Sequence, residues 1–199
     1  SGLVAAKSHD SQTEKHRITR GKNPLTTAIL ERNEEKVAQL LNSPSGISLS
    51  MKPDNDGWIP LMHAIDTEQI ELVRSLLRLD SADEQAMHGD ERKRHALCHA
   101  ALKGRADMVD LLLELSSADK QAKKCDELGE NALTLAIAGG HLALVKSLLK
   151  LASAKDQVAA VNMFGFNSLH HAVRCRRLEM IDLLLDQPSI DTQLLVPDK

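Results

Sequence analysis

The chain of 199 residues is long enough for one ordinary domain or a short array of repeats. Its hydrophobic content of 42% excludes a disordered chain, its 2% aromatic content predicts an aliphatic core, and no apolar run approaches the ~20 residues of a transmembrane helix. A net charge of −3 excludes a strong general attraction to nucleic acid or anionic lipid, and three cysteines at irregular spacing indicate reduced thiols in a cytosolic compartment.

A 36-residue period begins after a charged, aperiodic N-terminal flank, residues 1–17, which we expect to be loose. Each period contains a leucine and, three positions later, an alanine: Leu25 and Ala28, Leu61 and Ala64, Leu97 and Ala100, Leu133 and Ala136, Leu169 and Ala172. A valine or isoleucine follows nine positions after each alanine, and then a leucine pair. Five such copies in register predict repeats at 18–53, 54–89, 90–125, 126–161 and 162–186, with a C-terminal tail at 187–199.

Within a copy, the spacing predicts two short helices preceded by a tight turn. In the second copy the turn is 54–57, the first helix runs from Leu61 to about Thr67, and the second from Ile70 to Leu79. Asp or Asn followed by Gly is typical of a turn with positive φ, so a projecting finger precedes each helix pair. Helices this short are unstable alone, so the copies are expected to stack into a one-dimensional array.

The segment after each second helix has a pattern of its own. Ser81, Ser117 and Ser153 each begin a run of helix-forming residues, which predicts an added helical turn with the serine as its N-cap. In the first copy, residues 42–46 are instead expected to form a loop.

The short motif around each repeated leucine resembles the Thr-Pro-Leu-His-x-Ala signature of ankyrin repeats. It reads Asn-Pro-Leu-Thr-Thr-Ala at 23–28 and Ile-Pro-Leu-Met-His-Ala at 59–64, and a Gly-His pair follows in the fourth copy at 140–141. The resemblance covers residues 18–186 and implies an all-α solenoid of stacked helix-turn-helix units joined by β-turn fingers. It also implies protein binding along a concave face made of fingers and first helices.

All three aromatic side chains fall in the fingers rather than at core positions: Trp58, Phe164 and Phe166. Exposed aromatics near arginine are enriched at binding hot spots, so Trp58 and Phe166 are predicted anchors, supported by Phe164, Arg92 and Arg94. The alternative, which the sequence leaves open, is that each ring packs locally over a neighbouring finger.

The ends of the first helices are predicted to line the concave groove with Asp66, Lys103 and Arg174. Arg92, Arg94 and Lys103 make a basic stretch in the third copy, and together with Arg174 these cations would suit an acidic peptide with an apolar anchor. An ordinary scatter of surface charge is an equal alternative.

Catalytic and metal sites are not predicted. His63, His99 and His171 recur at one repeat position, but stacked helices lie about 8–10 Å apart, too far for shared ligation of one ion, so structural imidazoles are expected. No cofactor motif is present, and the short basic run at 92–94 alone does not indicate nucleic-acid binding.

The sequence therefore predicts a monomeric, non-enzymatic, cytoplasmic module that binds a partner protein or peptide. The alternative is a targeting or autoinhibitory segment of a larger enzyme, or of a secreted bacterial effector acting in the host cytosol, whose catalytic domain lies outside this chain.

Overall fold

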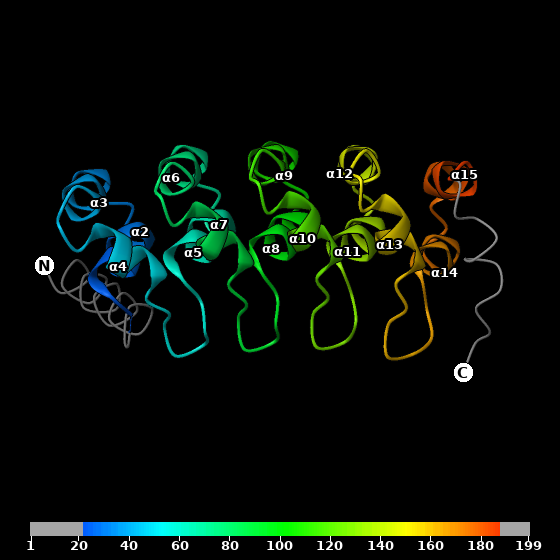
Figure 1. Ribbon diagram of the computed structural model, residues 1–199, viewed down its shortest axis with the longest axis horizontal. Helices are drawn as coiled ribbons and strands as arrows, with labels where there is room; N and C mark the ends of the chain where they lie inside the picture. The colour runs from blue at the N-terminus through cyan, green and yellow to red at the C-terminus, as the bar shows by residue number, and fades with distance from the viewer. Residues whose placement is uncertain (1–21, 188–199) are drawn as a thin grey trace, which may run out of the picture.

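The computed structural model describes residues 22–187, which form five helical copies stacked in a row (Figure 1). Each copy contributes a first helix: α2 (Pro24–Leu30), α5 (Pro60–Asp66), α8 (Ala96–Lys103), α11 (Ala132–Gly139) and α14 (Ser168–Arg174). Each also contributes a second helix: α3 (Glu34–Leu41), α6 (Ile70–Leu76), α9 (Ala106–Leu113), α12 (Leu142–Leu148) and α15 (Leu178–Leu185). Within the described residues every regular element is helical, so the predicted all-α repeat solenoid is confirmed.

Four of the five first helices begin with a side-chain cap, whereas α5 follows Ile59 and has none. Asn131 caps α11 by accepting a hydrogen bond from the Thr134 amide at 2.9 Å, and the Thr134 hydroxyl accepts one from the Asn131 amide at 3.0 Å. Gly140 ends the same helix at φ 80°, a left-handed conformation that glycine adopts at little cost. The observed α5 agrees with its predicted span to within one residue, whereas α6 ends three residues before Leu79.

The repeated leucine and alanine form the aliphatic core, as predicted. All five alanines and the first four leucines are fully buried, and Leu169 in the last copy is partly buried. The core divides into a large cluster from the second copy onward and a small separate cluster of Leu25, Ala28, Ile29 and Val37 in the first copy.

A third helix follows the second in the first four copies: α4 (Gly46–Met51), α7 (Ala82–Met87), α10 (Ala118–Lys123) and α13 (Ala154–Ala159). The added turn is confirmed in copies two to four. The loop predicted for the first copy is only partly right, because it ends at Ser45 and helix α4 starts immediately after it.

The serines occupy the N-cap positions of the third helices, as predicted, but the capping role expected of their side chains is wrong. Their side chains do not cap; the Ser81 hydroxyl instead accepts a hydrogen bond from the Gln85 side chain at 3.0 Å. The Ser117 amide donates to Asp83 of the preceding copy at 2.8 Å. The amide is thus satisfied by a neighbouring repeat, which a single-copy pattern does not reveal.

The fingers project from one edge of the row, opposite the second helices (Figure 1). In the second finger, Asp54 accepts hydrogen bonds from the amides of Asp56 and Trp58 at 3.0 and 2.9 Å, which closes the turn. Asp90, Asp126 and Asn162 do the same in the next three fingers. Successive fingers are joined by backbone bonds, such as Glu127 N–H to the Arg92 carbonyl at 2.9 Å.

The predicted flank 1–17 lies outside the described residues, and so does the predicted tail after Gln187. The domain boundaries proposed for these ends therefore stay predictions.

Candidate partner-binding surface on the fingers and first helices

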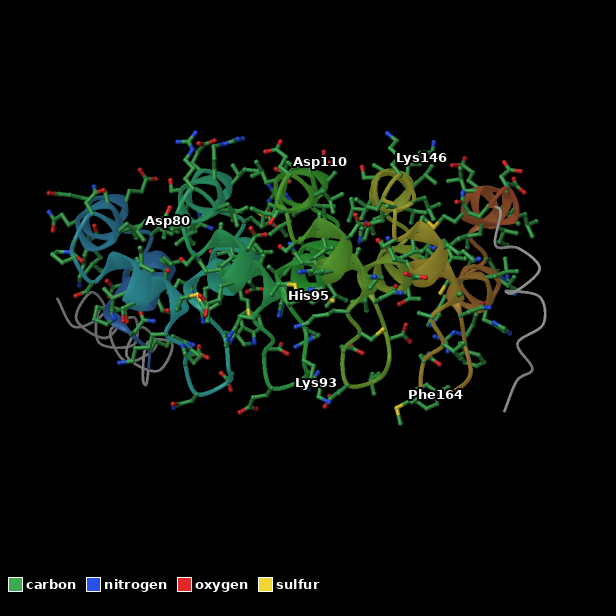
Figure 2. The ribbon with its side chains drawn as sticks, in the orientation of Figure 1. Asp80, Lys93, His95, Asp110, Lys146 and Phe164 are labelled. Atoms are coloured by element: carbon green, nitrogen blue, oxygen red, sulfur yellow. The ribbon has the colours of Figure 1, made fainter. Side chains whose placement is uncertain are left out.

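The fingers end on the edge of the array opposite the second helices (Figure 1). Figure 2 shows Lys93 and Phe164 at the ends of their fingers, and Asp110 and Lys146 on the opposite edge, on second helices. Two side chains at the ends of first helices, Lys103 and Arg174, are exposed.

Trp58 is half-buried, with its ring centroid 5.2 Å from that of His63 and 4.5 Å from that of His99. His63 Nε2 lies 2.8 Å from Asp54 Oδ2, and Lys22 also binds this carboxylate. Burial alone would raise the pKa of Asp54, but the hydrogen bonds from Lys22 and His63 outweigh it and hold that pKa below its usual value. Trp58 thus closes over a buried charge network, and its role as a binding anchor stays a prediction.

Phe166 is half-buried too, but it lies beside an exposed cation. The Arg174 guanidinium lies 5.3 Å from the ring centroid, at the distance of a cation–π contact. His170 stacks on the same ring at 5.7 Å. The predicted site residues Phe166 and Arg174 are therefore brought together in the last copy.

The predicted basic stretch in the third copy is largely ion-paired within the chain. Arg94 binds Asp90 through two guanidinium nitrogens at 3.0 and 3.2 Å. Lys103 pairs with Asp66 of the preceding copy at 2.8 Å, and Arg92 Nε lies 3.9 Å from a Glu127 carboxylate oxygen. An acidic ligand would compete with these carboxylates, so the basic stretch offers less attraction than its sequence indicates.

Two exposed apolar residues that the sequence prediction did not select lie next to Phe164. Leu128 is 42% exposed, Met163 62% and Phe164 54%, and the Met163 amide donates to the Leu128 carbonyl at 2.9 Å. We call these three residues the fingertip patch. A sequence signal was available, because the second and third fingers carry Asp56 and Arg92 where the fourth and fifth carry Leu128 and Phe164.

The recurring histidines are buried and each faces a carboxylate. His99 Nε2 lies 3.2 Å from Asp90, and His171 Nε2 lies 3.1 Å from Glu130. Burial lowers the pKa of His99 to about 4, so this ring is neutral at pH 7. The described residues contain no group of three or more His, Cys, Asp or Glu side chains placed to hold a metal ion.

His95 and Cys98 form a buried pair inside the third copy, and Figure 2 shows His95 among the helices, away from the finger ends. Cys98 Sγ lies 3.8 Å from His95 Nε2. Burial raises the pKa of the Cys98 thiol to about 12, so it stays protonated and is a poor nucleophile. Within residues 22–187 no helix has the length and apolar character needed to span a bilayer.

Comparisons with known proteins agree with this architecture. A family model described as ankyrin repeats in three copies matches residues 3–88, 37–124, 78–159 and 97–194. Among solved structures, the ankyrin repeat domain of Bcl-3, described as a unique member of the IkappaB protein family, is similar with a TM-score of 0.71 and 25% identity. That match covers 83% of this chain and 71% of the solved one. No curated protein sequence matches the chain.

Proposed function

The chain belongs to the ankyrin-repeat family, whose members are generally protein–protein interaction modules, and from this premise we propose that its fingers and concave face bind a partner protein. The partner's main anchor is an apolar side chain that docks on the fingertip patch. The family's fold is non-catalytic, and the protonated Cys98 beside a neutral His95 supports a role without catalysis.

The observation that carries the proposal is the exposure of the fingertip patch. Clustered exposed apolar side chains mark interaction sites more often than scattered ones do. The backbone beneath the patch is held by the bond between Met163 and Leu128, and by the Phe164 and Phe166 amides, which both donate to the Asn162 side chain at 2.9 Å. A surface ordered before binding loses less conformational entropy when the partner docks.

A positive charge in the fifth copy indicates that the partner carries an acidic residue near its apolar anchor. Arg174 is exposed over the Phe166 ring, and among the described residues it is not ion-paired, in contrast to Arg94 and Lys103. A carboxylate on the partner would reach this guanidinium without displacing an internal acid. The proposed ligand is thus an acidic segment with an apolar anchor, bound at copies four and five.

The cysteines support a reducing, cytoplasmic compartment. Cys98, Cys125 and Cys175 are all free thiols, and Cys125 and Cys175 are only partly buried. Exposed thiols persist where disulfide formation is suppressed.

The proposal is tested by capture from a cytosolic extract with mass-spectrometric identification. The wild type is compared with Met163→Ser/Phe164→Ser, and with a control pair on the opposite edge, Asp110→Ala/Lys146→Ala. All four positions are exposed, so circular dichroism should be unchanged. A partner lost only by the fingertip variant supports the proposal. A partner retained by it, or lost equally by the control, places the interface elsewhere.

A further inference from the structure

The first copy packs differently from the others on the edge opposite the fingers. Helices α6, α9, α12 and α15 pack against one another in sequence, whereas the packing of α3 against α6 is weaker. The two core clusters divide at the same place, and Leu41 and Leu72 are the partly buried leucines that touch both. A cavity of about 470 Å³ opens between α3 and α6, which we call the outer cleft.

The amino-acid sequence explains the gap. In later copies the second helix faces the preceding one with Met108, Leu144 or Met180, all buried, while Leu72 at the same position is only half-buried. On the α3 side, Ala38 lines the cleft at the position where later copies carry Arg74, Asp110, Lys146 or Asp182. A longer side chain at this position can reach the next second helix, as Asp110 does when it accepts a hydrogen bond from the Ser147 hydroxyl at 3.3 Å, whereas the short Ala38 side chain leaves the cleft open beside it.

The cleft has an apolar floor and an acidic rim. Val37, Leu41 and Leu72 provide aliphatic surface, and the rim includes the carboxylates of Glu34, Glu68 and Glu71. The rim's one cation, Arg32, donates to the Thr67 carbonyl at 3.0 Å.

Nearby cations neutralise the rim only in part. Arg105 pairs with Glu68 but is shared with Asp107, both at 2.7 Å, and Arg74 lies 3.8 Å from Glu71. The second copy as a whole, residues 54–89, contains eight Asp or Glu and two Arg, a formal charge of −6 against −3 for the entire chain. Two of these eight acids, Glu68 and Glu71, line the cleft itself.

We propose that the outer cleft binds a basic amphipathic helix from a partner protein. A groove between two helices accepts the apolar face of a third, with anchors spaced i, i+3 or i+4, and i+7. A leucine or methionine of that helix would lie on Leu72 and Leu41, and its lysines or arginines would reach Glu34 and Glu71. The volume of about 470 Å³ is in the range of pockets that take several side chains.

This site lies on the opposite edge from the fingers and takes a ligand of opposite charge (Figure 1). The chain would then hold two partners, or two parts of one partner, at the same time. The inference does not depend on the fingertip patch, so either surface can fail its test without the other.

The probe is a fluorescent 14-residue peptide with leucine at helical spacing on one face and lysine elsewhere. Two peptides serve as comparisons: one with the same composition in scrambled order, and one with glutamate replacing lysine. Fluorescence anisotropy at about 0.1 M salt, where charges still act over roughly 10 Å, should give at least tenfold tighter binding of the patterned lysine peptide. Hydrogen exchange should show protection in α3 and α6.

Ala38→Arg is the key variant, because it fills the cleft with the residue that the second copy carries at the same position. Ala38→Gln adds bulk without charge. Ala38 is exposed on α3, so both should fold, as circular dichroism would verify. We expect Ala38→Arg to weaken peptide binding at least tenfold and Ala38→Gln severalfold, while the matched control Lys146→Arg and the fingertip variant Met163→Ser/Phe164→Ser have no effect.

The proposal is overturned if no peptide binds at millimolar concentration, if the three peptides bind alike, or if protection falls on the fingers. Unchanged binding by both Ala38 variants would overturn it as well. Loss of binding in Glu34→Lys/Glu71→Lys, together with a weaker salt dependence, would support the charge pairing.

Discussion

The second and third fingers share a backbone scheme with the fourth and fifth but present a different surface. In the first pair, Trp58 and Arg94 are the residue types of a binding hot spot, yet both are occupied within the chain: the ring lies between two imidazoles and the guanidinium is bound to Asp90. In the second pair, Met163 and Phe164 are exposed. Residue type alone therefore does not show which finger is available to a partner, because availability depends on what the neighbouring repeat supplies.

The largest expected difference in stability between the two regions comes from replacing the acidic residue that closes a finger. Buried Asp90 accepts from the amides of Arg92 and Arg94 at 2.9 and 2.8 Å and also holds the Arg94 side chain. Asp90→Ala leaves buried donors and a cation without their partner, at a cost of about 3 kcal/mol. Asp126 is half-buried and accepts hydrogen bonds from two amides, so Asp126→Ala should lower the free energy of unfolding by only about 1–2 kcal/mol. Urea unfolding followed by circular dichroism measures both, and equal losses would remove the distinction.

Truncating an aromatic residue should also cost more stability in the second finger than in the fifth. Trp58→Ala removes a ring packed against the core and should lower the free energy of unfolding by about 2–3 kcal/mol. Phe164→Ala truncates an exposed ring and should change it by less than about 0.5 kcal/mol. The comparison would be wrong if Trp58→Ala were as mild as Phe164→Ala.

The third copy should also be the part of the chain whose stability falls most as the pH is lowered. Burial lowers the pKa of His95 to about 4, and the charge of Lys124 adds to the lowering, so the unfolded chain binds more protons than the folded chain between pH 6.5 and 4. Stability is therefore complete above pH 6.5 and falls as the pH drops through this window, by about 2 kcal/mol from pH 7 to pH 5 for this group.

His95→Asn introduces the N-cap residue that the fourth and fifth copies carry as Asn131 and Asn167. The variant should lose this part of the pH dependence and keep the part due to His99, whose pKa is also lowered to about 4 by burial. Urea midpoints at pH 7 and pH 5 test this. A pH dependence equal to that of the wild type would show that His95 titrates normally.

A smaller effect than that of Asp90→Ala is expected at the turn between first and second helices, where one residue per copy has positive φ. Gly104 and Gly140 fill this position at φ 70° and 80°, but Arg176 adopts φ 55° in the fifth copy. Arg176→Gly should raise the free energy of unfolding by roughly 1 kcal/mol, because it removes backbone strain. Gly104→Ala should do the opposite, since its new Cβ would lie 2.3 Å from the His141 ring. A destabilising Arg176→Gly would indicate that the arginine side chain matters more than its backbone.

Much of the fold could be predicted from the sequence, because Leu, Ala and Val that recur at a fixed period are the residues that pack one repeat against the next. The third helices of copies two to four were visible for the same reason. The predictions that failed concern contacts between copies: the Ser117 amide donates to Asp83 of the preceding copy, and Lys103 is paired with Asp66, 37 residues away. Trp58 follows its finger glycine and Phe164 precedes its own, and the stacking that brings His99 onto Trp58 shows which of the two rings is covered.

The central claim is that a partner docks on the fourth and fifth fingers rather than on the second and third. Met163 and Glu91 occupy the same finger position two copies apart, and both are exposed. A photo-crosslinking amino acid placed at one or the other therefore compares the two regions on a common backbone. We predict that the partner captured by the wild type cross-links from position 163 and not from 91. Cross-linking from 91, or equally from both, would contradict the account.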